Sequence, residues 1–580
     1  MRSWQCLIGF LLLALNATAQ TPGASKSPLG AYSQPSTPPQ AAVQPVGSAS
    51  TPAPPKTMDQ VVDRAIEREH ALMEMLKTRT PVIETYLQDL KFDPRTGPTP
   101  VQDHYFLGRM DFGGSIERRD YLPKQTFESR LLGGFTRLYK LEYKPIGFSW
   151  MIFADRNDFN RRTYDFEYAY REFLGDVRCL VFNVTPRKGT GNGRFHGRIW
   201  VEDQGYNIVR LNGTYEPRPR LGGYFFHLDS WRLNLVSGYW LPTYIYSEEG
   251  DFSYGAQDKI AFKAQTRLWG YNLQKIARNS EYTDVLLDST VKDESPAAQD
   301  LSPLQAQRDW MRQAADNVVE RLRDAGLLAS EGELDKVLET VANNLLITNN
   351  IDLGRPVRTR LMLTSPLETF SVGDTIIISR GLVDVLPDEA SLAMVLAHEL
   401  AHIILGHNLG SRYAFSDRLL FSDESTYQNL GFRHFPEEET AADQKAVDLL
   451  RNSPYSQKLG TAGLFLREVG KRSHVLSALL TPHLGNSFTD HKGKVTRMSA
   501  LMDSAPALDP DKLDQIAALP LGGRVKLNAW DDHAELIKMT PTAIISARDK
   551  MPLGVTPFSP RLTRQGAIAD PTVSAAKTSN

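Results

Sequence analysis

Hydrophobic and polar residues alternate with two different periods along the chain. The change of period divides the chain into a region with the pattern of strands and a region with the pattern of helices. Between about residues 100 and 290 the period is two, which predicts strands. Residues 194–202 alternate cleanly, and the turn Asp203-Gln204-Gly205 leads into a return strand that alternates again. The pattern predicts a large antiparallel sheet with one polar and one buried face, with further strands at 176–186, 223–236, 239–248 and 259–273.

From residue 303 onward the apolar positions recur every three or four residues, a spacing typical of helices. Helices are expected at 303–327, 332–347, from Pro387-Asp388 through 395–407, at 436–452, 456–472 and 490–503. Strands are expected at 358–363 and 370–379, and the long connection 409–436 suits a loop or lid. The predicted fold is multidomain α+β, an antiparallel β-rich N-terminal domain followed by a mainly α domain.

The expected domain order is a signal at 1–19, a linker at 20–56, a helical segment at 57–99, the sheet domain at 100–290, a mainly helical domain at 303–504 and a partly irregular extension at 505–580. In the helical segment Pro81 separates two helical pieces. The linker is rich in Pro, Ser, Thr, Ala and Gln and has almost no large apolar residues, so we expect it to be disordered.

The first residues resemble a secretory signal. Arg2 gives a positive start, a short apolar run follows from Cys6 to Leu15, and Ala17-Thr18-Ala19 fits the cleavage rule. The chain is therefore expected to be exported to the periplasm or cell envelope, with an outer-membrane association as one option. An uncleaved anchor is the alternative to cleavage after Ala19, although the run is short for a membrane span.

Charge and cysteine content narrow the function classes. The formal net charge is -2 and the pI about 6.7, which gives no electrostatic basis for nucleic-acid binding. After cleavage only Cys179 remains, so no intramolecular disulfide can form, and Cys179 is expected to be a buried small hydrophobe. His196 and His227 are isolated within the sheet region, where surface or core roles are expected rather than metal ligation.

His398-Glu399-Leu400-Ala401-His402 is the stretch with clear chemistry. Two histidines four residues apart lie on one face of a helix, so both rings can reach one metal ion. Glu399 is placed to take a proton from a water molecule that the metal activates. A buried helix that carries two histidines by chance is the alternative interpretation of this motif alone.

A third metal ligand is expected from Glu439, 37 residues after His402 on a separate helix. A catalytic zinc site needs three protein ligands and one open position, and two histidines and a glutamate meet that need. Asp443 shares a helical face with Glu439 and can accept a hydrogen bond from the distal nitrogen of a ligand histidine, most simply His398. The alternative for 437–443 is an acidic helix start favoured by the helix dipole.

The order His-Glu-x-x-His-x-x-x-Gly-His, then Glu-x-x-Ala-Asp, then a later histidine and arginine resembles the M48 family of zinc metallopeptidases. The resemblance covers about 330–504 and includes the segment 376–382. It implies that His398, His402 and Glu439 bind one zinc ion per chain and that Glu399 is the general base. It also implies a metalloendopeptidase of the cell envelope that acts on misfolded or membrane-associated proteins in protein quality control.

The same resemblance places His491 in the site, as an oxyanion-stabilising or site-shaping residue, with Arg497 six residues later. The family has proline after this histidine, and this chain has Lys492. The family often has Asn-Ala-Phe before its edge strand, and this chain has Glu368-Thr369-Phe370. His407 matches an extra histidine of the family, for which a structural role is expected rather than ligation.

The hairpin at 193–216 with the following aromatic strand and Trp240-Leu241-Pro242 resembles the curved sheet of periplasmic lipoprotein-carrier proteins. This implies an apolar cavity, whereas an ordinary sheet with a solid core is the alternative. Two other functions stay open: a lipid- or lipoprotein-binding or chaperone-like protein with a regulatory peptidase domain, and an inactive metalloprotein. The expected partners are peptides or proteins, with membrane-surface or lipoprotein contact as a further option. An extended substrate is expected to pair with an edge strand within 370–379.

Overall fold

The computed structural model describes residues 54–93, 97–113, 117–120, 146–216, 226–236, 239–254, 258–271, 303–407, 432, 434–481, 484, 488–489, 495, 497–509, 511–512, 515, 524–527, 534–536 and 553–564. From Pro55 onward these residues belong to one compact unit. The expected signal 1–19 and nearly all of the expected linker 20–56 lie outside the described residues.

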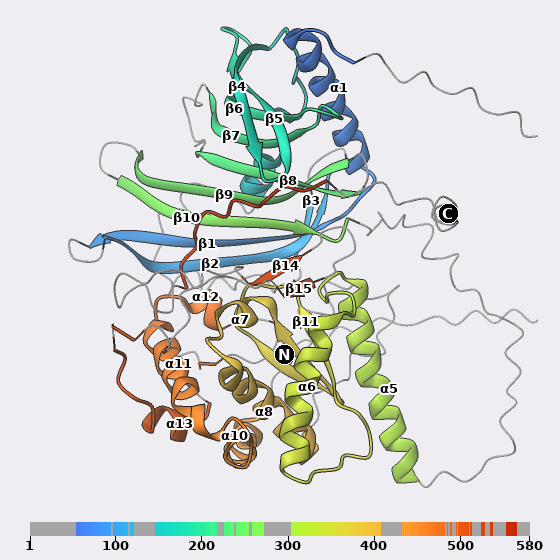
Figure 1. Ribbon diagram of the computed structural model, residues 1–580, viewed down its shortest axis with the longest axis vertical. Coiled ribbons are helices and arrows are strands. Elements are labelled where there is room, and N and C mark those ends of the chain that lie inside the picture. The colour runs from blue at the N-terminus through green and yellow to red at the C-terminus, as the bar shows by residue number, and fades with distance from the viewer. Residues whose placement is uncertain are drawn as a thin grey trace, which may run out of the picture. The chain divides into compact units, whose positions relative to one another are not determined.

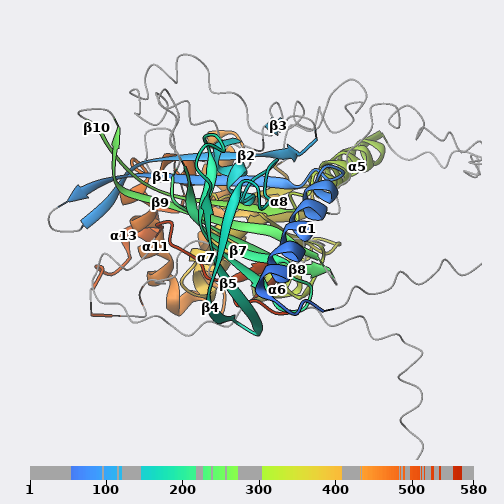
Figure 2. The ribbon, with the colours of Figure 1, turned by 90° about the horizontal axis from the view of Figure 1, so that it is seen from above.

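A ten-stranded sheet dominates the first half of the described chain, and every neighbouring pair of its strands is antiparallel. Its strands β1 (Val82–Asp93) and β2 (Gly97–Asp111) run in a clearly different direction from β4 (Tyr164–Leu174) and β5 (Val177–Pro186) (Figure 2), as expected for a twisted sheet. In spatial order the strands are β3 (Glu117–Asp120), β2 (Gly97–Asp111), β1 (Val82–Asp93), β10 (Asp258–Trp269), β9 (Tyr239–Tyr254), β8 (Leu228–Val236), β7 (Ile208–Glu216), β6 (Arg194–Glu202), β5 (Val177–Pro186) and β4 (Tyr164–Leu174).

The expectation of a second helical piece after Pro81 is wrong, because residues 82–93 form strand β1 and residues 97–111 form β2. In β1 the residues of both faces are buried from Val82 to Gln88, so the strand lacks the polar and apolar alternation that identifies a half-exposed strand. The predicted α+β class, with its antiparallel sheet before a helical region, is confirmed.

One face of the sheet is covered by helix α1 (Met58–Leu76), together with α4 (Ile146–Ser149) and the 3₁₀ turn η1 (Trp150–Ile152). Glu69 of α1 forms a two-bond ion pair with Arg232 of β8, at 2.6 and 2.7 Å. Both side chains are almost completely buried, so loss of either partner would leave an uncompensated charge in the core.

The second half of the described chain consists of helices around a small mixed sheet (Figure 1). Helix α8 lies at its centre and packs on α6, α10, α11 and β12. The elements are α5 (Pro303–Asp324), α6 (Glu333–Thr348), β11 (Arg358–Met362), β12 (Thr369–Val372), β13 (Thr375–Ser379), α7 (Arg380–Val385), α8 (Glu389–Leu405), α10 (Pro436–Arg451), η2 (Ser456–Lys458), α11 (Leu459–Arg472), α12 (Ser477–Leu480), α13 (Ser499–Asp503), β14 (Val525–Leu527) and β15 (Ala534–Leu536).

The single strand expected at 370–379 is instead the hairpin β12–β13. Gly373 turns the chain with φ +57°, a left-handed conformation that favours glycine, and a Cβ there would lie 2.7 Å from the Ala315 Cβ. Strand β13 is central, because it also pairs in parallel with β11, so β12 is the edge strand on this side.

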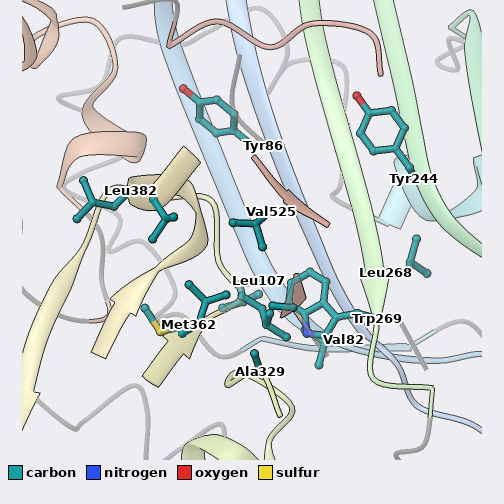
Figure 3. Close-up of a cluster of buried hydrophobic side chains, with 14 of the residues drawn as sticks. Val82, Tyr86, Leu107, Tyr244, Leu268, Trp269, Ala329, Met362, Leu382 and Val525 are labelled. Carbon is teal, nitrogen blue, oxygen red and sulfur yellow. The ribbon is translucent and has the colours of Figure 1, made fainter. Parts of the chain in front are cut away.

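A buried apolar cluster joins the large sheet to the helical region (Figure 3). Trp269 of β10 contributes the largest side chain, and its Nε1 donates to the carbonyl of Gly326 at 2.7 Å. The cluster includes Val82, Tyr86, Leu107, Leu268 and Trp269 from the sheet and Ala329, Met362, Leu382 and Val525 from the helical region.

A buried polar contact, which we call the Glu84 clamp, connects the sheet to the segment that precedes β12. Glu84 accepts hydrogen bonds from the backbone N–H and the hydroxyl of Ser365, at 2.6 and 2.8 Å. It also pairs with Arg267, which donates to the carbonyl of Leu363 at 2.8 Å. The large sheet thereby fixes the chain four to six residues before edge strand β12.

The residues 553–564, here called the C-terminal strap, cross the large sheet (Figure 1). The side chain of Gln88 in β1 bonds both to the carbonyl of Leu553 and to the N–H of Val555. Farther along, the Tyr244 hydroxyl donates to the Thr556 carbonyl at 3.1 Å, and the Leu562 carbonyl accepts from Asp176 at 2.8 Å. The extension 505–580 was expected to pack as irregular structure, and its strap packs on the sheet.

Cys179 is buried in β5, as expected of a small hydrophobe, and its burial raises the pKa of the thiol to about 12. Within the described part of the chain no helix has the length and apolarity needed to cross a bilayer.

Candidate metal centre

Helix α8 carries the motif, and its two ends are fixed by local capping. The Asp388 carboxylate accepts from the N–H of Ser391 at 2.8 Å, as an N-cap does. At the other end Gly406 takes φ +72° and donates its N–H to the last carbonyls of the helix. His398, Glu399 and His402 are fully buried on this helix, so their orientation is set by packing.

The structure brings together the three expected ligands. The Nε2 atoms of His398 and His402 lie 3.2 Å apart, and the nearer Glu439 oxygen is 3.1 Å from the first and 3.8 Å from the second. One atom from each residue lies within 4.8 Å of the others, a spacing that a single metal ion can bridge. Glu439 reaches this point from the first turn of α10, which packs closely on α8.

The distal nitrogens of both histidines have partners that orient the rings. Asp443, one turn after Glu439, accepts from His398 Nδ1 at 2.9 Å, and its second oxygen accepts from the N–H of Met498 at 2.9 Å. His402 Nδ1 lies 2.9 Å from Nδ1 of His407. A metal on Nε2 of His402 requires the proton on Nδ1, so His402 would donate to His407. This contact places His407 beside the site in a supporting position.

Charge within the cluster suits a cation. Burial and the charge of Arg497 lower the pKa of His398, but hydrogen bonds with the Asp443 and Glu439 carboxylates outweigh them and raise it to about 9. Burial lowers the pKa of His402 to about 4. Glu439 is partly buried, yet its hydrogen bonds with the two histidines hold its pKa well below the usual range. A proton on His398 therefore provides positive charge between two carboxylates, where a metal ion would replace it.

Glu399 lies in the same buried space with both carboxylate oxygens free of hydrogen bonds among the described residues. The nearest cation is Arg497, whose Nη2 is 3.6 Å from Glu399 Oε1. Arg497 is itself buried and lies over the Phe488 ring at 4.9 Å. An orphaned buried carboxylate next to three converging ligands fits a group that works on a bound water molecule.

One neighbour of the cluster was not foreseen from the sequence. The ring of His434 stacks on the ring of His402, with centroids 3.8 Å apart and an angle of 13°. Burial and the charge of His402 lower the pKa of His434 to about 4. The one sequence signal was its position five residues before Glu439, because the stack itself is a tertiary contact.

Several other predicted residues are not part of the described cluster. His491 and Lys492 fall outside the described residues, as does nearly all of the expected lid 409–436. His196 bonds to Glu216 at 2.9 Å, and His227 lies 3.1 Å from the Asn212 side chain, so both make local surface contacts.

Residues 332–428 match the sequence model of peptidase family M48. This part of the chain is similar to the M48 peptidases. The family consists of zinc metallopeptidases, and the His-His-Glu cluster is the donor set that such an ion takes. The match and the cluster together support metallopeptidase activity for this part of the chain. Among curated proteins no sequence matches the chain.

Three solved structures are similar at low identity. A LolA superfamily protein from Nitrosomonas europaea is 9% identical with a TM-score of 0.18, covering 38% of this chain and 96% of that chain. A putative outer membrane lipoprotein-sorting protein domain from Vibrio parahaemolyticus is 10% identical with a TM-score of 0.18, covering 36% of this chain and 91% of that chain. A DUF1329 family protein from Desulfovibrio piger is 10% identical with a TM-score of 0.18, covering 36% of this chain and 90% of that chain. Such low TM-scores say nothing about activity.

Proposed function

We propose that the chain is a zinc-dependent endopeptidase that binds one zinc ion through His398, His402 and Glu439. The observation that carries the proposal is the convergence of these three side chains beside the unpaired carboxylate of Glu399. Zinc held there would polarise the scissile carbonyl and lower the pKa of a water molecule to ~7.

Glu399 is the proposed general base. Its carboxylate takes a proton from the attacking water as the new bond to the carbonyl carbon forms, and it delivers that proton to the leaving amine. The burial of Glu399 and the absence of a hydrogen-bond partner among the described residues leave its oxygens available for this transfer. The guanidinium of Arg497 lies 3.6 Å from this carboxylate.

Edge strand β12 is the proposed binding site for an extended substrate. It packs directly on α8 and its outer side has no partner strand in the described sheet. A peptide that adds to this edge would pair through its backbone, which suits a protease that accepts many unfolded sequences.

We further propose that the protein works in the cell envelope on misfolded or membrane-associated proteins. This proposal rests on the signal-like residues 1–19 and on the sequence resemblance to M48 proteases. Mass spectrometry of the mature protein tests it, since cleavage after Ala19 would leave Gln20 as the first residue. A cytoplasmic protein that keeps its N-terminus would contradict it.

Lipid or lipoprotein binding by the sheet remains an alternative, and no observation favours it. Both faces of β1 are buried from Val82 to Gln88, with Ile83 and Leu87 on one face and Glu84 and Tyr86 on the other. This part of the sheet therefore leaves no apolar face open to a lipid.

The decisive experiment compares zinc-loaded wild type with Glu399→Gln and Glu437→Gln on unfolded casein. Glu437 is exposed on α10 and serves as the matched control. We expect wild type and the control to cleave, and Glu399→Gln to bind zinc but lose activity by at least ~100-fold. Zinc-loaded wild type that cleaves nothing, or cleavage that survives in Glu399→Gln, would refute the proposal.

A further inference from the structure

His434 lies on the segment that leads into α10. Described residues of this segment contact both the expected metal ligands and edge strand β12. The ring of His434 stacks on the expected ligand His402 at 3.8 Å. Two residues earlier, the ring of Phe432 packs on Phe370 of edge strand β12, with centroids 4.7 Å apart. Phe432 therefore contacts the strand on which we place the substrate, and His434 contacts an expected metal ligand.

The imidazole of His434 is buried without hydrogen bonds. Its side chain is 1% exposed, and neither ring nitrogen has a hydrogen-bond partner in the described structure. The closest acidic oxygen, on Glu438, is 3.4 Å from Nδ1 and already accepts from the N–H of Phe435 at 3.0 Å. A buried polar group without a partner destabilises the folded protein.

Stacking alone does not explain a histidine at this position. A phenylalanine would cover the face of His402 equally well and would carry no unpaired nitrogen. Metal ligation does not explain it either, because the ligand atoms that lie within 4.8 Å of one another come from His398, His402 and Glu439 and do not include His434. What remains is a partner that arrives with the substrate.

We propose that His434 is a catalytic residue that donates a ring N–H to the carbonyl oxygen of the scissile peptide bond. The inference rests on the proposed peptidase function and assigns the site a donor that the ligand set lacks. As the water oxygen attacks the carbonyl carbon, the π electron pair moves to the carbonyl oxygen, the bond from His434 strengthens, and the water proton passes to Glu399. His434 keeps its own proton throughout.

The environment supports such a donor. A neutral imidazole carries one N–H and one free lone pair, so the buried ring of His434 can act as a hydrogen-bond donor. A preorganised donor in a water-excluded site stabilises developing negative charge far better than water does. The stack on His402 holds the ring in place before the substrate binds.

Two variants separate donation from stacking. His434→Phe keeps a ring over His402 and removes the N–H, whereas His434→Gln keeps an N–H donor and removes the ring. His474→Phe is the control, because His474 is an exposed histidine of the same domain. Each protein is assayed for zinc content, for kcat and KM on a peptide, and by calorimetry for binding of a phosphinic peptide that mimics the tetrahedral state.

For His434→Phe we expect full zinc content, kcat lower by ~100- to 1,000-fold, and KM within about threefold of wild type. Binding of the phosphinic peptide should weaken in parallel, and His434→Gln should recover at least about tenfold of the lost kcat. Wild-type kcat and phosphinic-peptide affinity in His434→Phe would overturn the inference, and so would loss of zinc from that variant.

The calorimetric comparison keeps this inference distinct from the proposed function. If zinc-loaded wild type cleaves nothing but binds the phosphinic peptide, the proposed function fails while the binding data still decide on His434. If wild type binds zinc but not the phosphinic peptide, the donor assignment is overturned.

Discussion

Replacing Asp443 with asparagine tests how the metal centre is held in place. One carboxylate oxygen accepts from His398 Nδ1 and the other from the N–H of Met498, both at 2.9 Å. Asparagine has one acceptor oxygen and an NH₂ group, so it can accept from only one of these two donors. The substitution is nearly isosteric, and it therefore removes a hydrogen bond and a charge without opening a cavity.

The expected magnitude follows from the position of this contact. Loss of the partner behind a metal-binding histidine weakens metal affinity ~10- to 100-fold, or about 1.4–2.7 kcal/mol. A second effect acts in the opposite direction at neutral pH. Asp443 helps to raise the pKa of His398 to about 9, so zinc must displace a proton from wild type at pH 7. Because the variant holds that proton less tightly, the full difference in affinity appears only near pH 9.

Zinc affinity is measured by chelator competition at pH 7 and pH 9, and proton release by calorimetry in buffers of different ionisation enthalpy. We expect Asp443→Asn to bind zinc at least about tenfold more weakly at pH 9 and to release fewer protons at pH 7. Asp448→Asn, on the same helix with 67% of its side chain exposed, should match wild type. A folded Asp443→Asn protein with wild-type affinity and proton release would refute the reasoning.

Three further predictions concern stability. In the metal-free protein His398 keeps its proton to about pH 9 and His402 stays neutral to about pH 4. The imidazole of an unfolded chain titrates near pH 6.5. Urea midpoints should therefore fall as the pH rises from 6.5 to 9, because His398 is protonated in the folded state, and also as the pH falls from 6.5 to 4, because His402 is neutral there. A midpoint that rises toward pH 9 would contradict this. Glu84→Gln should lower the unfolding free energy by ~3–5 kcal/mol, while the exposed control Glu74→Gln has little effect; equal urea midpoints would show that the clamp is dispensable. Leu562→Ala in the strap should lower the free energy of unfolding by ~2–5 kcal/mol, measured by tryptophan fluorescence during urea unfolding. A decrease below about 1 kcal/mol would mean that the strap contributes little to stability.

The parts of the site that follow from local geometry could be predicted from the sequence. His398 and His402 share a helix face because of helical pitch, and the positions of Glu439 and Asp443 follow from the same pitch on α10. The family resemblance was needed to connect the two helices, since nothing local links residues about 40 positions apart. The stack of His434 arises from tertiary packing and has no periodic signature.

The fold could be predicted where one face of an element meets water. The alternation of β6 and β7 predicts strands, whereas β1 has no such alternation because both of its faces are buried. The β12–β13 hairpin was expected as one strand, because both short strands are apolar and Gly373 alone marks the turn.

The C-terminal strap has a consequence for the time course of synthesis. Gln88 and Leu553, which bond to each other, are separated by 465 positions. At ~5–20 residues per second the ribosome adds Leu553 roughly 20 to 90 s after Gln88. Until Leu553 and Val555 have been made, the side chain of Gln88 lacks its partners in the strap, whereas the last expected metal ligand, Glu439, is made earlier. A chain truncated between Asp443 and the strap would thus carry a complete metal-binding motif and a sheet without its strap. Exposure of that sheet would distinguish the truncated chain from the full-length protein.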